Sequence, residues 1–360
     1  MIYLYIFIIS SFFIYLAEHI HKEHTKIKYV CFCLAIIVPS FFAAIRDKYC
    51  GIDVTFYVTP TYDSAKSYSS ISSFMNDTEI EYGYGIFVYY ITKLFGDLFY
   101  VHFFTQIVII SPFILLLTTL KKEYEINIYI AYFIYLLLCY NTSLCIIRQN
   151  IASSISILSI VFLIRKKYLL FLLFGVCACF VHNSNILFII PAVLLYLFRD
   201  KVSNFKNILL LSIAIISIYS LYIYLLPSLG NIMGEMYMDR MESNSDSNSG
   251  GITTLILKTT LVFLPFFFYT KELSKYNFIL ILPVFSLLFY LLGREIAYLG
   301  RLGTPYTIFI PISLVLYLRN KYFLSICVIV ISLALWYGSV ILKGGYETYP
   351  FIQDKYWNFK

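Results

Sequence analysis

The first group of residues able to carry polar chemistry comes after two apolar segments. An arginine, two aspartates and a glycine stand close together where an apolar run stops, in the stretch Arg46-Asp47-Lys48-Tyr49-Cys50-Gly51-Ile52-Asp53-Val54-Thr55-Phe56-Tyr57. Charges at a membrane edge need partners, so this stretch indicates a pocket for a polar, anionic ligand. The alternative is an interfacial arginine that extends towards water beside a helix-terminal aspartate. The choice depends on where the other charged residues lie.

Similar polar groups recur at the edges of later apolar runs. They are Arg148-Gln149-Asn150, His182-Asn183-Ser184, Gly293-Arg294-Glu295 and Arg301-Leu302-Gly303. Each has a structural alternative, which is an interfacial arginine, a turn that contains a histidine, or a surface ion pair. Their meaning therefore depends on the elements that position them.

Composition places the chain in a membrane. It is 60% hydrophobic and 13% charged, with a mean hydropathy of +0.80, whereas soluble domains carry about 25% charged residues. A water-soluble fold of this length cannot bury so much apolar surface. We therefore predict an all-α polytopic membrane protein that forms a single transmembrane domain over residues 1–360.

Apolar runs predict about twelve transmembrane helices. The run near residues 84–96 is shorter than the ~20 residues of a span, so we predict a re-entrant or interfacial helix there. With that choice the basic loops all fall on the cytoplasmic side, in agreement with the positive-inside rule. The predicted spans are 2–16, 27–45, 98–120, 126–142, 148–164, 168–181, 184–198, 207–226, 252–270, 275–292, 303–318 and 322–340.

This topology brings the polar groups to the external face. The predicted external segments are the loops 46–97, 227–251 and 293–302 and the C-terminal tail 341–360. The charged residues at or near this face are Arg46, Asp47, Asp53, Glu81, Arg148, His182, Arg294, Arg301 and Glu347. A charge at membrane depth costs at least ~2.5–3.5 kcal/mol, so these residues need partners or a wet cavity. Four arginines facing one compartment predict a pocket for a phosphate-bearing ligand, because the guanidinium group matches phosphate geometry.

Other chemistries lack their motifs in this chain. The sequence contains no P-loop, no glycine-rich dinucleotide turn, no GxSxG and no HExxH, which argues against ATP-driven or nicotinamide chemistry. Most of the eight cysteines lie inside apolar runs, without a CxxC pair or a histidine at zinc spacing. We therefore expect no cofactor and no metal.

The motifs together resemble the EpsG family of Wzy-type polysaccharide polymerases. The resemblance spans about residues 40–350, and its motifs stand in the family's order. They are Arg46-Asp47…Gly51-Ile52-Asp53…Tyr57, Glu81-Tyr82-Gly83-Tyr84, Arg148-Gln149…Ala152, His182-Asn183-Ser184, Arg294, Arg301 and Tyr349-Pro350. The chain departs from the family in having Val54 before Thr55, where a second acidic or hydroxyl residue is frequent. The turn at His182 also lacks a bulkier continuation.

The resemblance implies a GT-C-like glycosyltransferase in the bacterial inner membrane, with its active site facing the periplasm. Such polymerases transfer the growing glycan from undecaprenyl pyrophosphate to a new lipid-linked repeat unit. The implied partners are the undecaprenyl-pyrophosphate-linked oligosaccharide, membrane lipid and a chain-length regulator, and no nucleic acid is expected.

The site residues follow from this reaction. A pyrophosphate leaving group needs cationic stabilisation, for which the candidates are Arg46, Arg148, Arg294 and Arg301. An acceptor hydroxyl needs a general base, for which Asp53, Glu81 and His182 are the candidates. Supporting roles are expected for Asp47, Gln149, Tyr57 and Asn183.

Three other functions remain open from the sequence. A lipid-linked oligosaccharide flippase would also bind pyrophosphate with arginines, but would carry internal repeats and charges reachable from both faces. A membrane O-acyltransferase would use a histidine and an acyl donor from the cytoplasmic face, where the histidines are His19, His21 and His24. An O-antigen ligase would share the donor and differ only in its acceptor.

Overall fold

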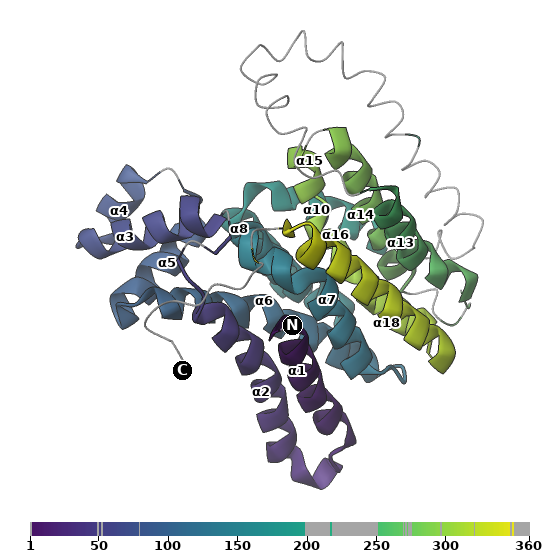
Figure 1. Ribbon diagram of the computed structural model, residues 1–360. Helices are drawn as coiled ribbons and strands as arrows, with labels where there is room; N and C mark the ends of the chain where they lie inside the picture. Colours follow the sequence, from purple (N-terminus) through teal and green to yellow (C-terminus); the bar gives the residue numbers. More distant parts are fainter. Residues whose placement is uncertain are drawn as a thin grey trace. The chain divides into compact units, whose positions relative to one another are not determined.

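The computed structural model describes two long stretches of the chain. These are residues 2–198 except 49, 52 and 79, and residues 251–345 except 269, 271, 273–275, 296 and 320, together with residues 217 and 348. All regular elements in this described part are helical (Figure 1), as the composition predicts. The expected span 207–226 apart from residue 217, most of the loop 227–251 and most of the tail 341–360 lie outside it.

The chain divides into two compact units, Met1–Ile186 with Trp336–Lys360, and Leu187–Leu335. The first unit holds α1 (Ile2–His19), η1 (Lys22–His24), α2 (Thr25–Ala44), η2 (Val54–Val58), α3 (Thr59–Ser67), α4 (Ile71–Asp77), α5 (Tyr82–Phe95), α6 (Leu98–Lys121), α7 (Ile128–Cys145), α8 (Ile147–Ile164), α9 (Tyr168–Val181), η3 (Asn183–Asn185) and η6 (Tyr337–Leu342). The second unit holds α10 (Ile186–Leu197), α13 (Ile252–Phe263), η4 (Leu264–Phe268), α14 (Asn277–Glu295), α15 (Ala297–Arg301), α16 (Thr304–Thr307), α17 (Phe309–Tyr317) and α18 (Tyr322–Trp336), apart from one terminal residue of α10 and of α18. The single transmembrane domain stays a prediction.

Eight helices of the described chain are long and apolar enough to cross a membrane. Three shorter apolar helices cover Tyr168–Val181, Asn183–Leu197 and Ile252–Phe268. Together these helices coincide with every predicted span except 207–226, which lies outside the described residues. The chain is therefore a multi-pass membrane protein, whereas the total number of spans and the GT-C-like fold stay predictions.

The short apolar run near 84–96 forms α5, a helix of 14 residues. At about 1.5 Å per residue it measures roughly 21 Å, which is less than the ~30 Å of a bilayer core. Gly96 ends α5 in the left-handed conformation, and the Asp97 side chain accepts a hydrogen bond from the N–H of Phe99 at the start of α6. The turn between α5 and α6 is thus encoded by a C-terminal glycine and an N-capping aspartate.

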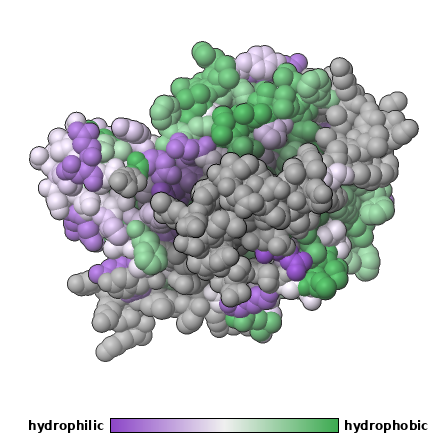
Figure 2. All heavy atoms as spheres, turned by 90° about the horizontal axis from the view of Figure 1, so that it is seen from above, coloured by the Kyte–Doolittle hydropathy of each residue, from purple (hydrophilic) through white to green (hydrophobic). Residues whose placement is uncertain are grey.

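The polar stretch before α5 is more ordered than its composition predicts. It reads as a solvated loop rich in Ser, Asp and Tyr, yet η2, α3 and α4 occupy most of it. A small core of Ala65, Phe74 and Tyr89 joins α3, α4 and α5. This part lies at the left of Figure 1, and on the face seen in Figure 2 its atoms are mostly hydrophilic or weakly polar.

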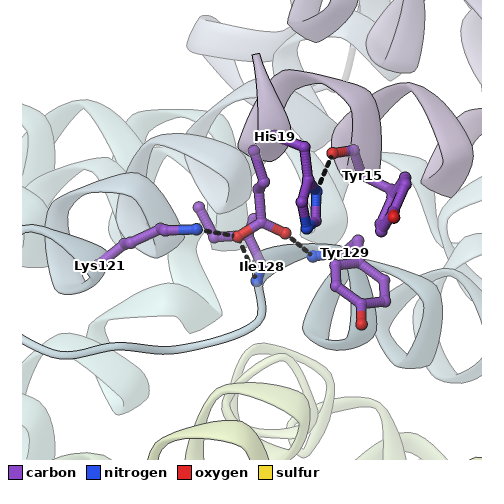
Figure 3. Close-up of polar contacts among 6 residues, drawn as sticks. Tyr15, His19, Lys121, Ile128 and Tyr129 are labelled. Atoms are coloured by element: carbon purple, nitrogen blue, oxygen red, sulfur yellow. Dashed lines mark hydrogen bonds and ion pairs between the residues drawn. The ribbon is translucent and has the colours of Figure 1, made fainter. Parts of the chain in front are cut away.

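Glu18 joins three helices at one end of the first unit. Its carboxylate, near the end of α1, accepts hydrogen bonds from the backbone N–H groups of Ile128 (3.1 Å) and Tyr129 (3.0 Å), and it pairs with Lys121 (Figure 3). The first N–H groups of a helix have no intrahelical acceptor, so Glu18 caps α7. This contact places Lys121 at the same end as the basic loop after α1, as the predicted topology requires.

In the second unit, two glycines bring α14 and α15 into close contact. A Cβ atom on Gly293 would lie 2.4 Å from the Cα atom of Gly300, so only glycine permits this approach. Arg294 and Arg301 each follow one of these glycines, and both side chains are exposed. The glycine contact therefore holds the two arginine backbones at one turn.

Candidate functional site

The centre of the candidate site is a carboxylate held by two cationic partners in the first unit. Glu81 Oε2 accepts a hydrogen bond from Arg148 Nη1 at 2.6 Å. Glu81 Oε1 lies 2.7 Å from His182 Nδ1. All three side chains are partly buried, with between 17% and 19% of each exposed. The structure thus brings together one predicted arginine and two of the three predicted base candidates.

Three helix ends position this group. Glu81 precedes α5, Arg148 lies in the first turn of α8, and His182 follows α9. At the break between α7 and α8, the side-chain amide of Asn150 donates hydrogen bonds to the carbonyls of Thr142 and Ile146. Both carbonyls also accept hydrogen bonds from backbone N–H groups, so Asn150 adds a side-chain link between α7 and the start of α8, where Arg148 lies.

Gly83 explains why Glu81 reaches His182. A Cβ atom at Gly83 would lie 2.9 Å from backbone atoms of Phe180 and Val181, closer than real Cβ atoms come. The start of α5 therefore packs directly on the backbone at the end of α9. This contact sets Glu81, two residues before the glycine, against the histidine that follows Val181.

Replacing Gly83 with alanine is expected to destabilise the protein by about 1–3 kcal/mol, because backbone must move to admit the methyl group. The Glu81–His182 contact should also lengthen. Any activity of this site should therefore fall by more than the loss of folded protein explains. Gly338→Ala is the matched control, since a Cβ atom there meets nothing within 4 Å. Thermal unfolding in detergent measures the effect, and equal Tm values for both variants would contradict it.

Electrostatics keep Glu81 ionised. Partial burial alone would raise its pKa, but the hydrogen bond from His182 and the charge of Arg148 outweigh burial and hold the pKa of Glu81 at about 2. A carboxylate with so low a pKa is a weak proton acceptor. Glu81 is therefore suited to orient its neighbours rather than to serve as the base.

The low pKa of Glu81 predicts a pH-dependent stability. A carboxyl group whose pKa is depressed by folding stabilises the protein above its unfolded value of 4.5, and this contribution is lost as the pH falls towards 2. The Tm of the wild type should therefore drop over this interval relative to that of Glu81→Gln. Parallel Tm curves for the two proteins in detergent would contradict the ion pair.

The contact with Glu81 fixes the tautomer of neutral His182. A carboxylate can only accept, so the proton lies on Nδ1 of His182. Nε2 makes no hydrogen bond to any residue that the structure describes. In this state Nε2 has a lone pair and can accept a proton from a bound hydroxyl group.

Arg148 also packs against an aromatic ring. Its guanidinium carbon lies 4.0 Å from the centre of the Tyr57 ring, and its Nε atom is buried without a hydrogen-bond partner among the described residues. Arg148 and Tyr57 line a pocket of about 180 Å³, together with residues of η2, α3 and α5. Tyr57, a predicted supporting residue, therefore lies beside Arg148, which is predicted to bind phosphate.

Tyr84 lies at the centre of the predicted residues, although sequence reasoning did not select it. Burial raises its pKa, and Arg148, Asp53, Arg46 and Glu81 all lie near enough to influence its phenol electrostatically. The side chain is only 1% exposed, and its hydroxyl has no hydrogen-bond partner in the described part of the chain. Its position identifies Tyr84 as a neutral hydroxyl group within the site.

Arg46 is buried rather than open to solvent. Its Nη1 donates to the Leu144 carbonyl at 2.6 Å, and its Nη2 donates to His102 Nδ1 at 2.9 Å. Since arginine has no acceptor, the proton of neutral His102 lies on Nε2. Pyrophosphate binding by Arg46 stays a prediction, and the geometry shows a residue that links the end of α2 to α6 and α7.

The other predicted residues have separate positions. Asp53 and Gln149 are buried, Asp47 is half-buried, and Asn183 is exposed. Arg294 and Arg301 belong to the second unit, and their participation in the same site stays a prediction.

Sequence reasoning also missed two ionisable residues inside apolar helices. His102 lies in α6, and Lys258 of α13 lies 4.7 Å from the centre of the Tyr290 ring. An ionisable residue within an apolar run was the available signal.

Comparison with known proteins assigns the family. The family model described as "EpsG family" matches residues 29–353, which is nearly the whole chain. No curated protein sequence and no solved structure matches the chain. The resemblance read from the motifs is thereby confirmed, and the chain is a multi-pass membrane protein of the EpsG family.

Proposed function

We propose that the protein is a bacterial inner-membrane polysaccharide polymerase. It transfers the growing glycan from undecaprenyl pyrophosphate to a new lipid-linked repeat unit at the periplasmic face. The observation that carries this proposal is the Glu81 carboxylate between His182 and Arg148. This arrangement combines an oriented base with a cation for a phosphate-bearing leaving group, both of which glycosyl transfer from a lipid pyrophosphate requires.

The reaction is a direct displacement at the anomeric carbon. The acceptor hydroxyl oxygen forms a bond to that carbon while the bond to the pyrophosphate oxygen breaks. The bonding electron pair leaves with the lipid pyrophosphate, and the hydroxyl proton passes to His182 Nε2. The configuration at the anomeric carbon is inverted.

Each residue of the group has a separate task in this step. Arg148 stabilises the negative charge that develops on the pyrophosphate. Glu81 holds the His182 ring and stabilises the imidazolium that forms, in the manner of the carboxylate in a catalytic triad. Pyrophosphate binding by Arg46 and a role of Asp53 as the base stay predictions.

Complementation of a polymerase-null strain tests the function. The expected result is a ladder of lipid-linked glycans of increasing length on a gel. Single repeat units that cross the bilayer without forming a ladder would instead support a flippase. Single units moved to a different acceptor, without a ladder, would support an O-antigen ligase.

A further inference from the structure

The pocket beside Arg148 is lined by fewer charged residues than a site that binds only anions would need. Arg148 supplies one cation, and most of the remaining wall consists of aromatic rings and hydroxyl groups. The rings belong to Phe56, Tyr57 and Tyr84, and the hydroxyl groups to Thr61, Ser64 and Thr78. Apart from Arg148 the lining residues are uncharged, which favours a neutral ligand rich in hydroxyl groups.

Aromatic and hydroxyl groups together match the two kinds of surface on a sugar ring. The face of a pyranose presents C–H groups, which pack on the electron-rich face of an aromatic ring. Its edge presents hydroxyl groups, which exchange hydrogen bonds with Ser and Thr side chains. Phe56 and Tyr57 are 68% and 45% exposed, so their rings remain accessible to such a ligand.

The size of the pocket limits the ligand to a small one. Its volume is about 180 Å³, below the ~300–1,000 Å³ of pockets that enclose drug-sized ligands. One pyranose ring is therefore a suitable occupant, whereas an oligosaccharide must extend beyond the pocket.

Two further features point to a ligand. The Tyr84 hydroxyl, in a side chain that lines the pocket, is buried without a partner among the described residues, which is unfavourable unless another group satisfies it. The backbone that presents Phe56 and Tyr57 is the π-helical η2, a conformation that is rare and frequent at functional sites.

We infer that this pocket binds the sugar residue joined directly to the lipid pyrophosphate of the donor. Arg148 lines the pocket and is also the residue of the group around Glu81 that is proposed to bind the pyrophosphate. A sugar ring in the pocket would therefore lie directly beside that phosphate. This inference rests on the proposed function and adds the subsite that holds the donor sugar. Its Phe56 and Tyr57 rings pack on the sugar face, and its hydroxyl groups contact the sugar edge.

Binding measurements with purified protein in detergent test the subsite. The probes are farnesyl pyrophosphate linked to the repeat unit polymerised in the complementation test, farnesyl pyrophosphate alone, and the free repeat-unit glycan. Phe56→Ala should weaken binding of the linked probe roughly two- to tenfold and leave farnesyl pyrophosphate alone unchanged. Ser64→Ala should act in the same direction. Tyr90→Ala is the matched control, since Tyr90 is an exposed aromatic residue outside the pocket.

The probes separate the possible failures. Equal weakening of linked and unlinked farnesyl pyrophosphate in Phe56→Ala would overturn the sugar subsite, because the residue would then contact lipid or phosphate. Unchanged binding of all probes in both pocket variants would overturn it as well. A wild type that binds no pyrophosphate probe would overturn the proposed function together with the subsite.

Discussion

Replacing His182 with alanine is expected to reduce polymer formation by about 10²–10⁴-fold, the usual contribution of a positioned general base. Nε2 of His182 is the atom assigned to take the proton, and Glu81 holds the ring through Nδ1. The effect should fall on the rate of transfer and leave binding of the lipid-linked donor within a few-fold of the wild type. Initial rates and donor affinity of the purified variant measure both quantities.

A histidine at the opposite end of the first unit provides the control. His24 is an exposed residue of η1, and His24→Ala should leave the rate unchanged. A rate for His182→Ala within threefold of the wild type would show that His182 does not act as the base. Asp53 would then be the remaining candidate, because the low pKa of Glu81 makes it a weak base.

Replacing Arg148 with alanine is expected to lower the rate by about 10²–10³-fold, as removal of a group that stabilises developing negative charge does in other enzymes. The variant also leaves Glu81 with one partner, so its carboxyl pKa should rise towards the usual range. Arg148→Lys retains the charge but loses the planar donor group, and should recover only part of the rate. Transfer rates of the three proteins at saturating donor measure this series.

Arg165, at the other end of α8, is a matched control for Arg148. It follows α8 at the opposite end from Arg148, and its side chain donates to the Thr119 hydroxyl at 2.8 Å. Arg165→Ala should therefore change expression or stability slightly without changing the transfer rate per folded protein. An Arg148→Ala variant that transfers glycan as fast as Arg165→Ala would remove Arg148 from the reaction.

The transmembrane framework was predictable from the sequence because apolar runs and basic loops report it directly. Every predicted span within the described residues coincides with an apolar helix, and the Glu18–Lys121 pair agrees with the choice made for α5. The helices between Val54 and Asp77 were not predictable from composition. Their polar residues read as a loop, and the core that orders them combines Ala65, Phe74 and Tyr89 from three separate helices.

The residue types of the site were predictable, but their pairing was not. Glu81 lies 67 residues from Arg148 and 101 residues from His182, so no local pattern joins them. Their contact depends on the packing of Gly83 against the backbone of Val181. Only the folded chain shows that these two residues lie so close together. The same is true of Tyr84, which stands in the motif that begins at Glu81. Only the folded chain shows that its hydroxyl is buried without a partner among the described residues.

Conversion of a lipid-linked repeat unit by the purified protein tests the central claim most directly. The protein in proteoliposomes would be given undecaprenyl-pyrophosphate-linked repeat units, and the products would be analysed by mass spectrometry. The expected products are lipid-linked glycans of two or more repeat units, with one undecaprenyl pyrophosphate released for each glycosidic bond formed. Repeat units that stay single while they cross the bilayer, with no release of undecaprenyl pyrophosphate, would contradict glycosyl transfer by this protein.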